Sequence, residues 1–594
     1  EPPVIKPSKQ DTQKDPTISI DGKTALLGDK VYYRVNIDAS RLTDTAYKVW
    51  RLGMTDDYDQ EYLTLDAKHV EILDETGRDR TGEFNIQDKD GVLYAFAKTV
   101  DTMIPATGET VPGDPQPDDL KAYSEKTDKD YDPLKDPSID QSLLGHTYQV
   151  VMPMTVTKVK DGHTVENTAT QVTNDRRDKT NTVTNPLKEI NPTKDVTVQV
   201  GGDSIDGKSV YLNHTFLYRL DSSILPPDRA YQTVTDWGGT DQLNTEYDQY
   251  LGNWAVYASR DLYRDGQVLA AKGEKIAGSG FDSSKFGGNL FTVDADDNGK
   301  VTADATQAYL DLVSADNEHE AGWVLYLQCK RIAVADEVPN TWTETINGQP
   351  RESNKVVTKT PDMTPSIHLE KVDTPTLKQE GQEQADRDDP KQALKMDADS
   401  IGITFIITNT SKTDPATGDG AWYKASDLNL DDSTIVGDAH VDMDSLTYPA
   451  DWDTLVLKPG ESVSVTGTLK GVKEGETHTD RAIVTGTPLV ECAPSNGDPF
   501  NDKTDGGEDT DPEYSTGDVT EIDGKQLCAD TQTASNTDDW NGYRAKPLAS
   551  TGTAVLGLAG GALAVLLAGG SLLVFRKRHY AQGSGRHTAV NAGK

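Results

Sequence analysis

Three cysteines are the residues of this 594-residue chain with the most direct capacity for covalent chemistry. Cys492 and Cys528 lie 36 positions apart in what we interpret as one extracellular domain, so we expect them to form a disulfide. Closing a loop of that length would stabilise the fold by roughly 3–4 kcal/mol. The alternative, two free thiols, fits an oxidising compartment poorly. Cys329 lies in an alternating apolar run and is expected to be a buried core thiol.

Motifs of common enzymes are missing. The sequence contains no Gly-x-Ser-x-Gly, no His-Glu-x-x-His, no P-loop and no Cys-x-x-Cys. Its ten histidines show no ligand spacing, and its carboxylates are too numerous for any pair to be singled out as a glycosidase dyad. We therefore predict that the chain is not an enzyme, apart from the self-modification described below.

Residues 294–299 copy the start of an EF-hand calcium loop. The twelfth position, where such a loop places a Glu, is Ala305, and no helical pattern flanks the segment. A hairpin turn at Asn298 and Gly299 is the better interpretation. No cofactor is predicted, although calcium bound by acidic loops stays open, with no ligands to name.

The net charge of the chain limits the classes of partner that it can bind. It carries 98 acidic side chains against 59 Lys and Arg, a net charge of −39. So acidic a chain repels phosphate groups, which argues against nucleic acid as a partner. Its length predicts several domains. The basic excess is confined to residues 553–594, which hold five Lys or Arg and no acid.

An uncharged stretch at residues 554–575 has the length of a membrane span, because a helix needs about 20 such residues to cross a bilayer core. Arg576, Lys577 and Arg578 follow at once, which places that end in the cytoplasm. We expect a transmembrane helix rather than a buried core helix, with residues 1–546 outside the cell.

A pentapeptide precedes this span: Leu548, Ala549, Ser550, Thr551 and Gly552. The pentapeptide, apolar span and basic tail, residues 547–594, together resemble the sorting signal of Gram-positive surface proteins. Ala549 stands where Pro is usual, a variant similar to those used by some actinobacterial sortases. The resemblance implies that a sortase cuts between Thr551 and Gly552 and joins Thr551 to peptidoglycan. Retention as an uncut membrane anchor is the alternative.

Short runs rich in Val, Ile, Thr and Tyr alternate with turn residues through the extracellular part, as at residues 31–35, 403–407 and 463–465. Such spacing is typical of β-sandwich domains. We predict an all-β protein of tandem immunoglobulin-like sandwiches, followed by the single transmembrane helix.

The first 361 residues also repeat themselves. Ile-Asp-Gly-Lys occurs twice, each time eleven positions after a lysine, Lys9 or Lys194. Asn167 and Asn354 lie towards the ends of the two copies. We therefore divide the extracellular part into two homologous domains and a different third unit. These are residues 1–190, 191–361 and 362–546.

The repeated units resemble the C-terminal domains of the streptococcal antigen I/II adhesins. The closest stretches are residues 194–198, 205–208, 324–332, 353–354 and 358–361. The resemblance implies tandem immunoglobulin-like stalk domains that hold an adhesive head away from the cell wall. The segment 103–146 departs from the family pattern, so no partner-binding loop is carried over.

The third unit looks like an immunoglobulin-like module common in bacterial surface proteins, on the strength of residues 403–410, 457–461 and 476–486. Residues 494–518 are dense in Asp, Gly, Asn and Pro, which favours a solvated loop.

The antigen I/II resemblance implies one covalent reaction, an amide (isopeptide) bond between a Lys on the first strand and an Asn on the last strand of a sandwich. Burial favours the neutral amine, a buried protonated carboxyl polarises the Asn amide, and ammonia leaves. The matching positions are Lys9, Asp57 and Asn167 in the first domain and Lys194, Asp236 and Asn354 in the second.

Asp56 is an alternative to Asp57, since the local alignment can slide by one position. The competing interpretation is that each Lys is a solvated strand residue and each Asn a turn residue. Recurrence of six residues in two copies favours the cross-link. Lys371 and Asn536 are candidates in the third unit, without a repeat to support them.

We therefore expect a cell-surface, wall-anchored adhesin stalk of a Gram-positive bacterium. Its partners would be a sortase, peptidoglycan and an unidentified host or microbial ligand. The alternatives are a sortase-polymerised pilin, for which no donor-Lys motif is seen, and the anchor portion of a surface enzyme. Because the chain opens at Glu1 without a signal peptide, we expect it to be the C-terminal part of a longer protein.

Overall fold

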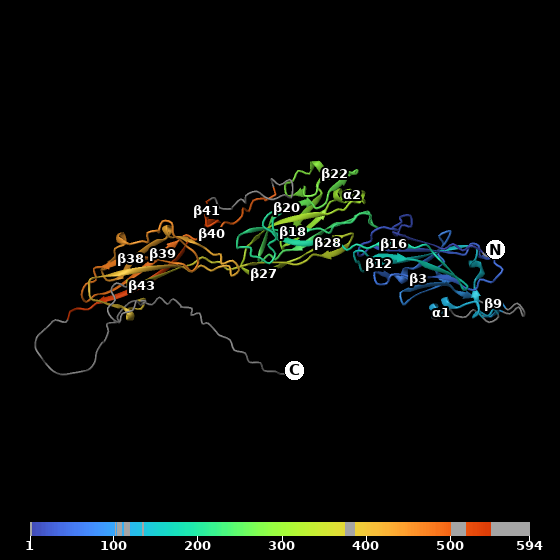
Figure 1. Ribbon diagram of the computed structural model, residues 1–594, viewed down its shortest axis with the longest axis horizontal. Helices are drawn as coiled ribbons and strands as arrows, with labels where there is room; N and C mark the ends of the chain where they lie inside the picture. Colours follow the sequence, from blue (N-terminus) through green and yellow to red (C-terminus); the bar gives the residue numbers. More distant parts are fainter. Residues whose placement is uncertain are drawn as a thin grey trace, which may run out of the picture.

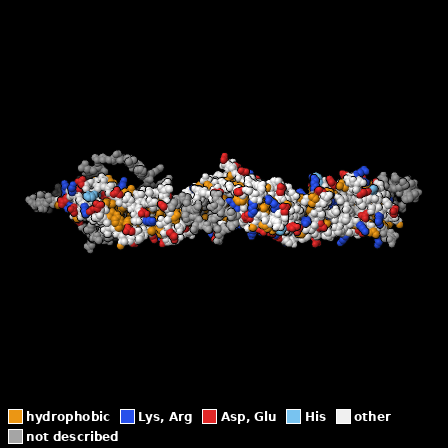
Figure 2. Space-filling model, turned by 90° about the horizontal axis from the view of Figure 1, so that it is seen from above, with side chains coloured by type: hydrophobic (Ala, Val, Ile, Leu, Met, Phe, Trp, Pro, Cys, Tyr) orange, Lys and Arg blue, Asp and Glu red, His pale blue; other side chains and the backbone are white. Residues whose placement is uncertain are grey.

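The computed structural model describes residues 3–100, 102–103, 110–111, 119–133, 136–374, 387–500 and 518–547. Within these ranges the strands form three sandwiches, each around its own apolar core, that follow one another in chain order along an elongated molecule (Figure 1). Acidic and basic side chains are interspersed along the face shown in Figure 2. The prediction of an all-β protein is confirmed.

The expected transmembrane helix at residues 554–575 lies outside the described residues. In the part of the chain that the structure describes, no helix combines the length and the apolar character needed to cross a bilayer.

The first sandwich consists of two main sheets. One has the order β1–β2–β12–β4, with β5 also paired to β12, and the other has the order β15–β14–β3–β7–β6. The strands of the first sheet are β1 (Ser8–Thr12), β2 (Lys30–Asp38), β4 (Leu63–Leu65), β5 (Glu71–Asp74) and β12 (Thr147–Val156). Those of the second are β3 (Leu52–Asp57), β6 (Phe84–Lys89), β7 (Val92–Ala97), β14 (Ala169–Thr173) and β15 (Arg176–Lys179).

Smaller pairings complete the first sandwich: β8 (Thr99–Val100) with β11 (Ser138–Ile139), β9 (Thr102–Met103) with β10 (Thr110–Val111), and β13 (Thr164–Asn167) with β16 (Val183–Pro186). A short helix, α1 (Leu120–Glu125), packs on β7. The strands alternate as a half-buried sheet requires: along β2, Val31, Tyr33, Val35 and Ile37 are buried while Lys30 is exposed.

The second sandwich has the same plan. One sheet runs β17–β18–β26–β20–β23 and the other β24–β25–β19–β28–β29. The first sheet contains β17 (Thr193–Thr197), β18 (Thr215–Asp221), β20 (Asp248–Ala258), β23 (Lys275–Gly278) and β26 (Trp323–Arg331). The second contains β19 (Trp237–Gln242), β24 (Phe291–Ala295), β25 (Lys300–Ala305), β28 (Trp342–Ile346) and β29 (Gln349–Glu352).

Here too there are smaller elements: β21 (Leu262–Arg264) pairs with β22 (Gln267–Ala270), β27 (Ala335–Asn340) pairs with β30 (Val356–Thr360), and α2 (Gln307–Ala315) contacts β21 and β25. The β27–β30 pair takes the place that β13–β16 has in the first sandwich. The two sandwiches are therefore copies of one topology.

The third sandwich pairs β31–β33–β38–β36 in one sheet and β32–β43–β39–β35 in the other. The first sheet contains β31 (Ile367–Asp373), β33 (Ser400–Asn409), β36 (His440–Val441) and β38 (Ser462–Lys470). The second contains β32 (Leu394–Met396), β35 (Asn429–Val436), β39 (Thr477–Gly486) and β43 (Ala534–Arg544). A further pair is β34 (Tyr423–Lys424) with β37 (Val456–Leu457).

An arm of the third unit reaches back to the second sandwich. The arm is the three-stranded sheet β40 (Leu489–Glu491), β42 (Lys525–Ala529) and β41 (Val519–Ile522), with residues 492–500. Figure 1 shows β40 and β41 between the two sandwiches. Phe500 is fully buried among Leu217, Tyr257, Tyr326 and other residues of the second sandwich, and Lys275 Nζ donates to Phe500 O at 2.8 Å.

Phe500 is thus buried, contrary to the solvated loop predicted for this tract, although Asn496 and Gly497 are exposed; residues 501–517 lie outside the described ranges. The contact also explains why nearly every residue of β26 is buried, on both faces of the strand. One face meets the core of the second sandwich and the other meets the arm.

Candidate functional site

The first candidate site is a buried ion pair between the two sheets of the first sandwich. Lys9 lies on the inward face of β1, and its Nζ contacts Asp56 Oδ2 near the end of β3. Both side chains have an exposed fraction of 0%. Such a pair is costly to desolvate, so it is seldom explained by stability alone.

Asp57, the predicted carboxyl, is exposed on the other face of β3. Successive side chains along a strand point to opposite faces, so a shift of one residue moves a carboxyl from core to solvent. The preferred assignment of Asp57 is therefore wrong and its alternative, Asp56, occupies the position beside the amine.

Asn167 ends β13, two residues before Ala169, which pairs with Asp56 across β14 and β3. Its exposed fraction is 1%, and neither the oxygen nor the nitrogen of its amide group has a hydrogen-bond partner among the residues that the structure describes. A buried amide without partners carries a penalty of roughly 1–3 kcal/mol, which marks it as a candidate for function rather than packing.

Electrostatics at this site favour a reactive amine. Burial lowers the pKa of Lys9, and the nearby carboxylate of Asp56 opposes that shift only in part. The ring of Tyr33 lies 4.6 Å from Lys9 Nζ and covers the amine. Burial raises the pKa of Tyr33 as well, so the phenol beside the amine stays protonated.

The second sandwich repeats the ion pair with Lys194 on β17 and Asp241 on β19. Burial lowers the pKa of Lys194, and the Tyr218 ring lies 4.5 Å from its Nζ. The predicted carboxyl, Asp236, lies just before β19, where its Oδ2 accepts a hydrogen bond from Gly348 N at 3.1 Å. The assignment of Asp236 is wrong because that side chain belongs to a turn contact and not to the core.

Asn354 is also misassigned. It is exposed, and its amide makes two hydrogen bonds of 2.9 Å to the main chain of Lys194. Asn181 makes the same two bonds, also of 2.9 Å, to the main chain of Lys9. Asn354 is therefore the counterpart of Asn181 and not of Asn167.

The counterpart of Asn167 is Asn340, at the end of β27. It has an exposed fraction of 7%, and its Nδ2 has no hydrogen-bond partner. Asn340 pairs with Val356 on β30 as Asn167 pairs with Val183 on β16.

Asp241 and Asn340 could both have been identified from the sequence, because matching residues of the two copies are separated by constant offsets. Lys194 follows Lys9 by 185 positions, and Asp241 follows Asp56 by the same 185. Asn340 follows Asn167 by 173 positions, as Asn354 follows Asn181. Each of the first two sandwiches thus holds one buried Lys–Asp pair and one buried Asn late in the domain, which is the set of groups needed for amide exchange with loss of ammonia.

In the third sandwich, Lys371 is buried and contacts carboxyls on two strands. Asn536, its predicted partner, instead accepts a hydrogen bond from Leu369 N through Oδ1 at 3.0 Å. The asparagine side chain fixes the main chain of β31 and is engaged there.

Two of the cysteines lie in the arm, and the third lies on β26 of the second sandwich. Cys492 and Cys528 form a disulfide between the segment after β40 and strand β42. Cys329 is a buried free thiol on β26, and burial raises its pKa well above the usual value. A thiol with a raised pKa is a poor nucleophile, so we assign Cys329 to packing.

The EF-hand-like segment forms the turn between β24 and β25. Asp296 Oδ1 accepts hydrogen bonds from the main-chain N atoms of Asn298 and Lys300, each at 2.9 Å, and Gly299 adopts a left-handed φ of 81°. It is a hairpin, as expected. Among the described residues, no group of three or more His, Cys, Asp or Glu side chains is arranged to hold a metal ion.

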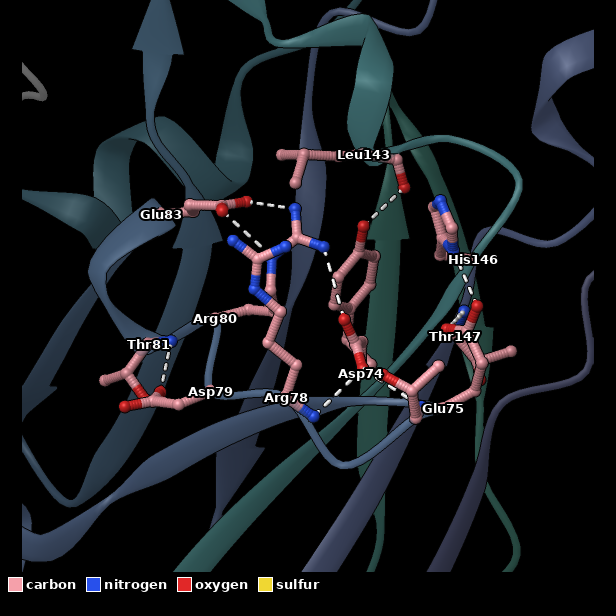
Figure 3. A network of polar contacts seen from close by, with 12 residues as sticks. Asp74, Glu75, Arg78, Asp79, Arg80, Thr81, Glu83, Leu143, His146 and Thr147 are labelled. Atoms are coloured by element: carbon pink, nitrogen blue, oxygen red, sulfur yellow. Dashed lines mark hydrogen bonds and ion pairs between the residues drawn. The ribbon is translucent and has the colours of Figure 1, made fainter.

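A separate polar network closes one end of the first sandwich (Figure 3). The Arg80 guanidinium lies between Glu83, at 2.9 Å, and Asp74, at 3.3 Å, while His146 contacts Glu75 at 2.6 Å. These contacts tie β5 to the turns beside it. We therefore interpret this network as structural support for the fold.

The pentapeptide Leu548, Ala549, Ser550, Thr551 and Gly552 lies outside the described residues.

Comparison with known proteins accounts for the repeated architecture. A model described as "Cell surface antigen I/II C2 terminal domain" matches residues 7–187, and one described as "Cell surface antigen C-terminus" matches residues 191–361. The chain belongs to the antigen I/II family of cell-surface antigens. The third sandwich lies beyond both matches.

A curated relative of this chain is an enterococcal protein. Aggregation substance of Enterococcus faecalis is 30% identical over 324 residues, which are 54% of this chain and 21% of that protein. The chain thus spans about a fifth of the length of this relative.

Two solved structures are similar to part of this chain. The C-terminal domain of the Streptococcus pyogenes protein AspA is 23% identical, with a TM-score of 0.45 over 60% of this chain and 100% of that one. The C-terminal domain of Streptococcus agalactiae BspA is 20% identical, with a TM-score of 0.43 over 59% and 99%.

Proposed function

We propose that the chain is the stalk of a wall-anchored adhesin, and that each antigen I/II domain is locked by one Lys–Asn amide bond. The bonds join Lys9 to Asn167 and Lys194 to Asn340. The observation that carries this proposal is that each of the two domains holds a buried Lys–Asp pair and a buried Asn with at least one amide atom that has no hydrogen-bond partner among the described residues.

The chemistry balances without a co-reactant. Asp56 or Asp241 takes a proton from the lysine ammonium and, as a neutral acid, donates a hydrogen bond to the Asn carbonyl. The amine nitrogen attacks the amide carbon, the bond from that carbon to the side-chain NH₂ breaks, and ammonia leaves with the proton passed on by the carboxyl. The carboxyl is regenerated, so each site acts once and only on itself.

The bonds suit a protein that is pulled from both ends. Lys9 and Lys194 lie on the first strands of their sandwiches, and Asn167 and Asn340 lie late in each domain. A covalent link between those positions keeps the strands between them out of the path of the force. The name of the enterococcal relative, aggregation substance, fits a role in attachment between cells.

Intact mass spectrometry of the reduced chain, residues 1–546, tests the cross-links. We expect Lys9→Arg and Lys194→Arg each to raise the mass, beyond the change of side chain, by one ammonia. Peptides carrying free Lys9 and free Lys194 in the unmodified chain would refute the proposal.

Anchoring rests on the resemblance of residues 548–552 to a sorting signal and has its own test. We expect the full-length protein to appear in the cell-wall fraction and to be released by muramidase. Thr551→Ala should move it to the membrane fraction. Equal wall linkage with and without Thr551 would contradict the sortase step.

A further inference from the structure

The core of the third sandwich contains a lysine between two carboxyl groups. Lys371 occupies an inward position on β31, after Ile367 and Leu369, where an apolar residue is expected. Its Nζ contacts Asp432 Oδ2 on β35 and lies 2.6 Å from Asp480 Oδ1 on β39. All three side chains have exposed fractions of 1% or less.

The two carboxyls come from the sheet opposite β31, since β35 and β39 are neighbours in one sheet and β31 is at the edge of the other. The lysine therefore bridges the two layers of the sandwich. Its main chain is held in place as well, because Lys371 N donates to Asp538 Oδ2 at 2.6 Å.

A histidine completes the cluster. His478, two residues before Asp480 on the same inward face of β39, has Nε2 3.1 Å from Asp480 Oδ2, and its side chain is fully buried. Of the two carboxyls, Asp432 is the one to which Lys371 Nζ donates a hydrogen bond, while Asp480 lies within ion-pair distance of both Lys371 and His478. The two carboxyls are thus not equivalent: Asp480 lies between Lys371 and His478, while Asp432 is the hydrogen-bond acceptor of the amine.

We propose that Lys371 and Asp432 condense into an amide bond with loss of one water, and that Asp480 moves the proton this requires. The site differs from those of the first two sandwiches, where the acceptor is an asparagine amide and the leaving group is ammonia.

The atoms balance as follows. Lys371 Nζ passes one proton to Asp432, which leaves a neutral amine beside a neutral carboxylic acid. The nitrogen attacks Asp432 Cγ, Asp480 takes a second proton from that nitrogen and delivers it to the departing hydroxyl, and water leaves. The new bond is Nζ–Cγ, the broken bond is Cγ–O, and Asp480 returns to its carboxylate form.

The environment supports these roles. Burial raises the pKa of Asp432, and the neighbouring Asp480 raises it further, so the neutral acid is accessible despite the attraction of Lys371. Burial acts in the same direction on Asp480, but His478 and Lys371 together outweigh it and hold the pKa of Asp480 below its usual value. One carboxyl is therefore prepared as an acid and the other as a base.

Peptide mapping of the full chain tests the proposal. The protein is denatured, reduced and digested, and we expect a branched peptide in which Lys371 is joined to Asp432, one water lighter than its two parts. Linear peptides with free Lys371 in folded protein would overturn the proposal, and so would a branch at Asp480. This readout is independent of the ammonia losses at Lys9 and Lys194.

Variants separate the roles. Lys371→Arg should abolish the branched peptide, and Asp431→Asn, on the exposed side of β35, should leave it intact. Asp480→Asn should slow its formation by roughly 100-fold, as expected for loss of a proton-transfer group. Asp432→Asn keeps the shape of the site and should give the same branched peptide, now by loss of ammonia. A complete branch in Asp480→Asn at the wild-type rate would refute the proton-transfer role.

Discussion

Asn354 holds the main chain of Lys194 through two hydrogen bonds of 2.9 Å, so its amide is already engaged at the edge of the sandwich. The same arrangement between Asn181 and Lys9 shows that it is a feature of the repeat. The asparagine available to the buried amine is the one without such bonds, Asn340 in the second sandwich and Asn167 in the first.

Replacement of Asn340 therefore discriminates between the two asparagines. We expect Asn340→Ala to raise the intact mass by one ammonia, after correction for the side chain, because the acceptor carbonyl is gone. Asn354→Ala should leave the cross-link in place and only loosen β17. A lost cross-link in Asn354→Ala with an intact one in Asn340→Ala would reverse the assignment.

Asp56 and Asp57 form a matched pair of variants for the first sandwich. Asp56→Ala should abolish the Lys9–Asn167 bond and also leave a buried ammonium without its partner, which costs about 3–5 kcal/mol. Asp57→Ala removes an exposed carboxyl and should change stability by no more than about 0.5 kcal/mol. Chemical denaturation with mass spectrometry of each variant measures both effects, and similar behaviour of the two variants would argue against Asp56.

The fold could be predicted from the sequence, because apolar inward and polar outward side chains alternate along strands such as β2 and β33. The lysines were also found, since each lies at a fixed distance from Ile-Asp-Gly-Lys. Asp56 was only the alternative to Asp57, and Asp241 was missed, because local similarity around Asp57 and Asp236 was followed instead of the constant offset from the lysines. The asparagines were harder to identify, because the offset between corresponding residues of the two copies is 185 at the Asp but 173 at the Asn. Loops of unequal length between these positions account for the difference.

Two features depend on neighbours that a local pattern does not reveal. Phe500 lies in a tract whose composition favours a solvated loop, yet a different domain buries it. In the third sandwich, Lys371, Asp432 and Asp480 come from three separate strands, so their proximity follows from the sheet order. A charged residue at an inward strand position, such as Lys371 after Leu369, was the available signal.

Stability of the first sandwich should depend on pH through Asp11. This side chain is fully buried, neither of its oxygens has a hydrogen-bond partner, and burial, followed by the charge of Asp21, raises its pKa to about 7 from 3.8. The folded state therefore binds a proton that the unfolded state releases between these two values. As the pH falls from 8 to 5, this group should raise the free energy of unfolding, by at most about 1.4 kcal/mol per pH unit.

Thermal unfolding at the two pH values checks the sign. Asp11→Asn keeps the shape of the side chain without its charge, so it should stabilise the sandwich at pH 8 and remove this part of the pH dependence. Asp203→Asn, at an exposed position, is the control. An unchanged pH dependence in Asp11→Asn would mean that the carboxyl ionises in the fold without cost.

Phe500 should control how stiffly the second and third sandwiches are joined. The direct connection between β30 and β31 is the short segment between Thr360 and Ile367, whereas the arm adds an apolar anchor and a disulfide that holds its base. Phe500→Ala removes a fully buried ring, a change that typically costs about 3–5 kcal/mol. We expect faster proteolysis after β40 and a shorter maximum dimension in small-angle scattering, because the two sandwiches can then bend about residues 361–366.

Val519→Ala, on the same arm but 39% exposed, should change neither measurement. If Phe500→Ala also changes neither, the connecting segment and the hydrogen bonds of Ser209 to Asp414 and of Tyr211 to Asp419 keep the stalk straight, and the arm serves another purpose.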